Sequence, residues 1–357
     1  MICYKNSSAT EAVRRYLLQI ISKSGPEPER LMSERDLAEH LHLSRVTVRR
    51  AIADLEEANY IIRLPGRKGA FTNPAVASEV EHTIGIVVYQ NYIGQIFSQF
   101  ISGLSRELYR CGHHYNYSLF QRSGQSASQM AFELENSGYD CIVWHIQSPE
   151  DLEVIGLLHQ HNFPVFTLCN PNFPEWGMAP GRNYGIDMKQ SGEAMASFFT
   201  EKKCRNAAFC CSGGDSVMSE SFRNALCQHG IRLAPENVFP GEKEFLKARS
   251  RLWKEGIDGL FCSLDEPRIR TLLEALSGSR QARKIPILLP ARNFSIRCRK
   301  DYSSLQIFYP DIHFYQEQCI ALGKHLAKGI IAYLKTGDRG RNVFLEGCRF
   351  SAHKNRS

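Results

Sequence analysis

The sequence lacks the features of secreted and membrane proteins. Its twelve cysteines are scattered, and no two of them form a Cys-x-x-Cys pair. No uninterrupted apolar run approaches the roughly 20 residues of a membrane-spanning helix. The N-terminal residues contain no apolar segment of the kind found in signal peptides. We therefore expect a cytoplasmic protein, without membrane contact, whose thiols are free and mostly buried.

Motifs for catalysis and metal binding are also scarce. No serine elbow, carboxylate pair or ordered Cys/His nucleophile stands out. The histidines at 113–114 and 159–161 have no cysteine or carboxylate at ligand spacing, which predicts solvated side chains rather than a metal site. Residues 213–215 lack the full phosphate-loop pattern and are expected to form a strand-to-helix turn. We expect no enzymatic activity, no metal and no cofactor.

The chain is longer than one average domain and modestly basic. It contains 357 residues and carries a formal net charge of +7, with a pI near 8.8. This length suits a small domain joined to a large one. The positive charge permits nucleic-acid binding without demonstrating it.

Residues 33–72 have the pattern of a helix, a turn, a second helix and a small β-hairpin. Apolar residues at helical spacing predict another helix over 10–23. Ser33 and Ser44 are expected to cap the two later helices, because their hydroxyls can accept from backbone N–H groups. The hairpin would cover 60–72 and have a basic turn. This is the layout of a winged helix-turn-helix, which places its second helix in the DNA major groove.

Basic and hydroxyl side chains gather on the helix after Ser44 and on the hairpin turn. Guanidinium groups can reach guanine edges or phosphates, and hydroxyl groups can donate to phosphates or contact thymine methyls. A solvated basic helix face is the alternative interpretation. We favour DNA binding because the cap, turn, basic helix and basic hairpin occur in the required order. The residues concerned are Ser44, Arg45, Thr47, Arg49, Arg50, Arg67 and Lys68.

This segment resembles the GntR family of bacterial transcription regulators. The resemblance is carried by residues 33–38 (SERDLA), 44–51 (SRVTVRRA), 55–56 (LE) and 65–69 (PGRKG). It implies that Arg35, Arg45 and Arg49 contact DNA, that Thr47 lies near the bases or backbone, and that Gly66 belongs to the wing. One departure is Asn59, where the family usually has glycine. Asparagine also tolerates the left-handed conformation expected there.

From Thr83 onward the chain alternates between buried strands and amphipathic helices. This alternation predicts parallel sheets covered by helices on both faces. Two consecutive sets imply two lobes with a ligand cleft between them. The predicted strands are 84–89, 114–120, 141–144, 164–168, 184–188, 207–211, 260–262, 285–289 and 305–308. The predicted helices are 96–110, 125–137, 151–161, 189–202, 219–229, 244–255, 266–276 and 312–334.

This larger part resembles the LacI/GalR regulators and the periplasmic sugar-binding proteins. The resemblance is carried by residues 83–87, 138–143, 184–187, 221–226 and 256–262. A GntR-type DNA-binding domain joined to a LacI-type effector domain is similar to the arabinose-repressor subgroup of GntR regulators. The resemblance implies a small-molecule effector and a homodimer on a double-stranded DNA operator.

The expected effector site departs from the family pattern. The register of a sugar-clamping arginine falls on Met218, and Leu264 replaces an asparagine beside Asp265. Losing sugar-facing polar groups argues against an ordinary pyranose site, because buried polar groups need partners. Strand-end capping, surface charge and core packing are the alternatives for the charged and aromatic candidates. The candidate ligand contacts are Tyr89, Trp144, Asp187, Met218, Asp265 and Arg292.

We therefore expect a winged helix-turn-helix over 1–74, a linker over 75–82, an effector and dimerisation domain over 83–350 and a basic tail over 351–357. The predicted function is a bacterial transcription regulator, acting as a repressor that binds a pseudo-palindromic operator as a homodimer. The alternative is an α/β binding protein or enzyme whose N-terminal helices serve assembly. Salt-dependent binding to DNA would distinguish the two, because phosphate contacts release counterions.

Overall fold

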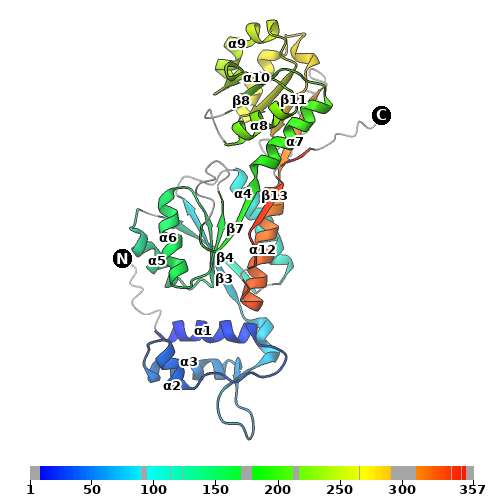
Figure 1. Cartoon of the computed structure of the whole chain (residues 1–357). Helices are drawn as coiled ribbons and strands as arrows, with labels where there is room; N and C mark the ends of the chain where they lie inside the picture. Colours follow the sequence, from blue (N-terminus) through cyan, green and yellow to red (C-terminus); the bar gives the residue numbers. More distant parts are fainter. Residues whose placement is uncertain are drawn as a thin grey trace.

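The computed structural model divides the chain into three parts, which Figure 1 shows stacked from a small N-terminal part to two larger lobes. We call the first part the reader (residues 9–80). The two lobes together are the body. The structure describes residues 9–89, 95–112, 114–122, 124–169, 179–211, 217–264, 266–290, 311–338, 340–346 and 348–350.

The reader contains the predicted elements in the predicted order. They are α1 (Ala9–Lys23), α2 (Glu34–His40), α3 (Arg45–Glu57), β1 (Ile61–Ile62) and β2 (Phe71–Thr72), of which the two strands pair antiparallel. Ser33 and Ser44 cap α2 and α3 as expected, each accepting from the backbone N–H three residues on. Asn59 has φ 62°, so the left-handed conformation expected there is confirmed.

The segment between reader and body is packed rather than extended. Residues Pro74–Glu79 form a 3₁₀ helix, η1, which begins with Asn73 accepting from the N–H of Ala75. Val80 is buried in the apolar core of the reader, together with residues of all three helices. The stretch predicted as a linker therefore leaves little free chain before the first strand of the body.

The first lobe, the N-lobe, is a parallel six-stranded sheet in the order β13-β7-β6-β5-β3-β4. Helices α4 and α12 cover one face, and α5 and α6 cover the other. The strands are β3 (His82–Tyr89), β4 (Tyr115–Arg122), β5 (Cys141–His145), β6 (Val165–Leu168), β7 (Arg182–Asp187) and β13 (Val343–Glu346). The helices are α4 (Gln95–Arg110), α5 (Ala127–Glu135), α6 (Pro149–Gln160) and α12 (Cys319–Thr336).

The second lobe, the C-lobe, has the strand order β14-β12-β11-β10-β8-β9, parallel except for β14. Helices α7 and α8 pack on one face, and α9 and α10 on the other. The strands are β8 (Ala207–Cys211), β9 (Val238–Phe239), β10 (Gly259–Ser263), β11 (Ile287–Pro290), β12 (Ile312–Glu317) and β14 (Cys348–Phe350). The helices are α7 (Met188–Glu201), α8 (Val217–Gln228), α9 (Glu242–Lys254) and α10 (Glu266–Leu276).

The chain crosses between the lobes at three places. It passes from β7 into α7, from β12 into α12, and from β13 into β14. The predicted α/β architecture with parallel sheets is thereby confirmed. Among the described residues the cysteines are free and mostly buried, Cys210 and Cys211 included. No helix in the described part is long and apolar enough to cross a bilayer.

The helix predicted over 312–334 is wrong in its first part, because Ile312–Glu317 is strand β12. Ile312, Tyr315 and Cys319 are buried at helical spacing and continue the pattern of the helix that follows. Pairing with β11 on one side and β14 on the other makes this segment a strand. The strand predicted at 305–308 lies outside the described residues. The strands β9, β13 and β14 were not predicted, since each is only two to four residues long.

Two glycines bring α4 and α12 into backbone contact. A Cβ on Gly103 would clash with the carbonyl oxygen of Ile320, and a Cβ on Gly323 would clash with the carbonyl oxygen of Phe100. Side chains of α12 such as Leu326 then fill the apolar layer between the helix pair and the sheet. The two helices therefore form one tightly packed pair on the N-lobe.

Candidate nucleic-acid interface

Helix α3 separates an apolar side from a basic side. Val48, Ile52 and Leu55 are buried against α1 and α2, and Ala51 lies with them. This leaves the arginines of the first turns on the outside, beyond the cap that Ser44 forms. All nine predicted DNA-contact residues lie at the surface. Thr47 is half-buried, and the exposed ones are Arg35, Ser44, Arg45, Arg49, Arg50, Gly66, Arg67 and Lys68.

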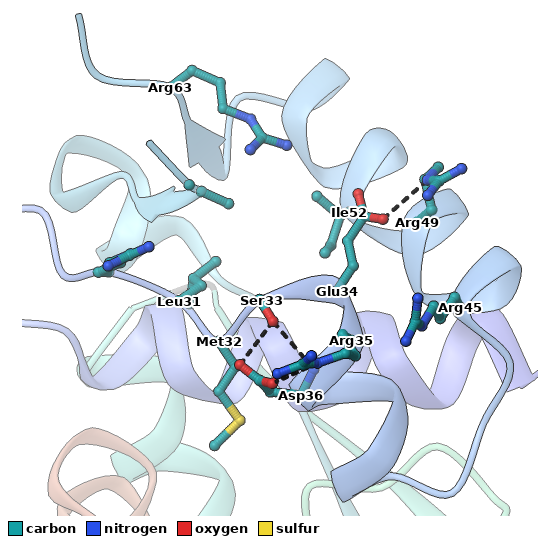
Figure 2. A pocket seen from close by; sticks show the side chains of 13 residues that line it. Leu31, Met32, Ser33, Glu34, Arg35, Asp36, Arg45, Arg49, Ile52 and Arg63 are labelled. Atoms are coloured by element: carbon teal, nitrogen blue, oxygen red, sulfur yellow. Dashed lines mark hydrogen bonds and ion pairs between the residues drawn. The ribbon is translucent and has the colours of Figure 1, made fainter. Parts of the chain in front are cut away.

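A groove of about 650 Å³ lies between α2, α3 and the start of the hairpin (Figure 2). Three of the predicted residues line it, Arg35 from α2 and Arg45 and Arg49 from α3 (Figure 2). Arg30 and Arg63 line it as well and were missed, because Arg30 precedes the cap of α2 and Arg63 follows β1, so both lie outside the basic helix and the basic turn. The five guanidinium groups come together only through the fold, and they face one concave surface that suits a phosphate backbone.

Acidic side chains of the reader hold several of these arginines in place. Arg49 Nε lies 3.0 Å from Glu34 Oε2, and Arg63 Nη2 lies 2.6 Å from Glu56 Oε1. Arg35 Nε lies 3.5 Å from Asp36 Oδ1. The hydrogen bond from the Ser33 hydroxyl lowers the pKa of Asp36, and Arg35 adds to this effect. Exposed pairs of this kind contribute only about 0–1 kcal/mol, so a phosphate can replace the carboxylates.

Val46 is a further surface residue that was not predicted to contact DNA. It is the second residue of α3, and 76% of it is exposed. It stands beside Arg45 and Thr47 on the side away from the core. An aliphatic side chain at this place can contact the methyl group of thymine. The sequence offered one signal for this exposure, because Val46 falls outside the apolar spacing of Val48, Ile52 and Leu55.

Three of the candidate effector contacts that the structure describes lie at or near strand ends of the N-lobe. Tyr89 ends β3, and its hydroxyl donates to Asp151. Trp144 is fully buried between the sheet and the α5–α6 layer, so it belongs to the core and has no surface to offer a ligand. Asp187 is half-exposed and caps α7 by accepting from the N–H of Gln190 at 3.0 Å. Met218 lies in α8. Asp265 and Arg292 lie outside the described residues.

The hydroxyl of Tyr89 is part of a buried polar network. The Asp151 carboxylate is fully buried and accepts from Tyr89, from Arg122 and from the backbone N–H groups of Gln147 and Ser148. Arg122 Nη1 also donates to the Tyr89 hydroxyl at 2.8 Å. Its side chain is 18% exposed, so part of the guanidinium faces outward. Burial lowers the pKa of the nearby His145 to about 4, so this imidazole is neutral at pH 7.

The reader matches a known family of DNA-binding modules. Residues 9–71 match the family model described as bacterial regulatory proteins, gntR family. The resemblance seen in the sequence is therefore confirmed, and this segment is a GntR-type helix-turn-helix DNA-binding domain. No curated protein sequence matches the chain.

Solved structures match the body in fold at low sequence identity. A regulatory protein of the LacI family from Chloroflexus aggregans has a TM-score of 0.55 and 14% identity, covering 74% of this chain and 95% of that one. The trehalose repressor from Escherichia coli has a TM-score of 0.54 and 11% identity, covering 76% and 100%. A carbohydrate transporter from Acidothermus cellulolyticus 11B, in complex with myo-inositol, has a TM-score of 0.55 and 14% identity, covering 77% and 95%. The predicted LacI-like and periplasmic-binding-protein-like fold is thereby confirmed.

We expect Val46 to contact the methyl group of a thymine. Thymines of a DNA duplex that the chain selects from genomic fragments are replaced one at a time by uracil, which removes only the methyl group. At one position the affinity of the wild type should fall about three- to fivefold, because burying one apolar carbon contributes about 0.8 kcal/mol. Fluorescence anisotropy titration measures the change.

The Val46→Ala variant should bind the same duplex more weakly and should not distinguish thymine from uracil at that position. Met32→Ala removes a different exposed apolar side chain, one that lines the groove, and it should keep the discrimination. If Val46→Ala still loses affinity on the uracil substitution, the contact is wrong.

Proposed function

We propose that this chain is a transcription regulator that binds DNA through its GntR-type domain and is controlled by a small molecule bound in the body. The observation that carries the DNA-binding part is the groove lined by five arginines on a segment that matches the gntR family model. The proposal places the N-terminal end of α3 in the major groove. It places the exposed hairpin turn with Arg67 and Lys68 on the backbone or in the minor groove.

The proposal extends to how the protein acts. Two readers held by one dimeric body would recognise a pseudo-palindromic operator. A dimer seated on an operator excludes other proteins from the same DNA, so repression is the action we propose. The operator would lie in the bacterial cytoplasm, where free thiols such as those of this chain persist. The alternative function, an α/β enzyme or binding protein with N-terminal helices for assembly, does not account for the basic groove.

The combined variant Arg45→Ala with Arg49→Ala tests the recognition helix. Each bidentate base contact contributes about 1–3 kcal/mol, so affinity for the selected duplex should fall at least about 30-fold. If either arginine instead binds a phosphate, the slope of log K against log salt should become shallower by about 0.9 for each phosphate that the variant no longer neutralises. Mobility-shift and anisotropy titrations from 50 to about 200 mM salt measure both quantities.

Arg14→Ala is the matched control for this test. Arg14 lies on α1 and pairs with Glu11 of the same helix at 3.6 Å, away from the groove. Its loss should leave affinity nearly unchanged. Binding by the double variant equal to that of Arg14→Ala would refute the recognition-helix assignment. Salt-independent DNA binding by the wild type would favour the alternative function.

The effector part of the proposal rests on the arrangement of the body. In open α/β sheets ligands bind beyond the carboxyl ends of the strands, and here Asp187 and Arg122 stand at such ends. Two of the structures of similar fold are a trehalose repressor and a carbohydrate transporter in complex with myo-inositol. We propose a polyhydroxylated effector of related kind. The replaced family residues count against an ordinary pyranose.

A ligand of this kind should raise the melting temperature of the full chain. At a concentration about 100 times its Kd it adds roughly 2.7 kcal/mol to stability, which shifts the transition by several degrees. Differential scanning fluorimetry against sugars, polyols, sugar acids and sugar phosphates measures this shift. A panel without any shift would favour a body that serves only as a dimerisation unit.

The dimer would form through the β4 edge of the N-lobe. Strand β4 lies at the edge of the described sheet, and it exposes 52% of Leu119. Tyr109 of α4, 73% exposed, lines a shallow pocket together with Tyr117 of β4. Phe132 of α5, 67% exposed, adds an apolar side chain from the helix layer on the other face of the sheet. Exposed apolar groups gathered on adjacent elements are typical of protein interfaces, and we propose that a second copy of this chain covers them.

Leu119→Lys should weaken this dimer. A charge in the covered centre of an interface costs about 2 kcal/mol or more, so the dimer Kd should rise at least about 30-fold. Sedimentation equilibrium of the full chain measures the Kd. Phe344→Lys is the control, because Phe344 is 47% exposed on β13, at the opposite edge of the same sheet. Equal dimer constants for the two variants would contradict this placement of the interface.

A further inference from the structure

Helix α1 presents two different faces. Val13, Leu17 and Ile21 recur every four residues and are buried in the core of the reader. Three polar residues at the same spacing, Arg15, Gln19 and Lys23, lie on the opposite face of the helix. We call these three residues the polar stripe of α1. In Figure 1 this helix lies between the rest of the reader and the N-lobe.

The first two residues of the polar stripe contact the start of strand β5. Gln19 Nε2 donates to Asp140 Oδ1 at 3.3 Å. Asp140 is nearly buried, and its other oxygen accepts from the backbone N–H of Thr83 at 2.8 Å. The Arg15 guanidinium lies 3.5 Å from the place where a Cβ on Gly138 would stand. The reader is thus attached to the N-lobe by side chains as well as by the chain that runs through η1.

The third residue, Lys23, lies at the C-terminal end of α12. Its ammonium is 5.2 Å from the centre of the Tyr333 ring. It is also 3.7 Å from the Cβ position of Gly337, the left-handed cap that ends α12. The unpaired carbonyl groups of a helix C-terminus favour a cation. Partial burial lowers the pKa of Lys23, and the charge of Asp140 opposes this shift.

The other end of α12 begins at a crossover between the lobes. Strand β12 of the C-lobe ends at Glu317, and α12 starts at Cys319. Over 18 residues the helix spans about 27 Å at ~1.5 Å per residue. The glycine contacts at Gly103 and Gly323 hold it against α4 along this path. In Figure 1 α12, in orange, runs from the lobe junction to α1.

We propose that α12 is a mechanical link between the lobe crossover and the reader, and that the polar stripe of α1 is the contact through which this link acts on DNA binding. The proposal rests on the function proposed above and names the route of its regulation. A ligand that changes the orientation of the two lobes relative to each other would move the start of α12. The polar contacts at its far end would then shift or release α1, and with it the position of α3.

Linkage allows this route to be tested with DNA alone. If the state of the crossover affects the reader, then DNA bound to the reader must affect the crossover to the same extent. In the proposal, the coupling between DNA binding and the crossover requires the contacts of the polar stripe. Removing the stripe should therefore break the coupling while leaving the groove of the reader intact.

Hydrogen exchange of the full chain, with and without the selected DNA duplex, tests the proposal. In the wild type, DNA should change the exchange rates of amides in 312–322, far from the groove. In Lys23→Glu, the amides of 333–337 should exchange about fivefold faster without DNA, because an anion replaces the cation at the helix C-terminus. DNA should still bind this variant, and its effect on 312–322 should be abolished.

Two further variants complete the experiment. Arg14→Glu makes the same charge change on α1 away from the body, and it should keep the wild-type response in both segments. Gln19→Glu places a second carboxylate beside Asp140, and it should likewise abolish the effect of DNA on 312–322, which keeps the test open if Lys23→Glu fails to fold. A DNA-induced change in 312–322 that persists in the stripe variants would overturn the proposal, as would its absence in the wild type. A wild type that binds no DNA would overturn the proposed function itself.

Discussion

The close contact between α4 and α12 is the constraint on which the rest of the molecule depends. At this crossing Gly103 and Gly323 leave no room for a side chain, so backbone lies against backbone. The contact fixes α12 to the N-lobe although the chain enters that helix directly from the C-lobe. Its last turn then meets Lys23 of the reader. One helix therefore contacts the reader and the N-lobe and is joined directly to the C-lobe. Its position is set by packing rather than by polar contacts that water can replace.

The polar contacts of the reader have the opposite character. Glu34, Asp36 and Glu56 each pair with an arginine of the groove at the surface. Such pairs orient guanidinium groups at little cost in stability and are easily exchanged for phosphates. The rigid part of the reader is its apolar core and the two serine caps beneath these arginines. A rigid scaffold under exchangeable charges suits a protein that must bind DNA and release it.

The strand ends of the N-lobe combine burial with full hydrogen bonding. Asp151 would be costly in a buried place, but two side-chain donors and two backbone N–H groups satisfy it. The network holds Arg122 in one position with part of its guanidinium outward. The residue types expected from sugar-binding relatives at Met218 and Leu264 are replaced in this chain. The proposed effector site therefore departs from the family pattern, and Arg122 at the end of β4 was not among the residues predicted from the sequence.

Interactions between neighbours in the sequence determined the helices and caps of the reader and the alternation of strands and helices in the body. The caps at Ser33 and Ser44 and the left-handed Asn59 depend on neighbours a few residues away, which a sequence displays directly. Tertiary structure decided what depends on distant partners. Ile312–Glu317 has helical spacing but is a strand because β11 and β14 pair with it. The polar stripe of α1 has the composition of a solvated face, yet it contacts the body, since Gln19 meets its partner 121 residues further along the chain.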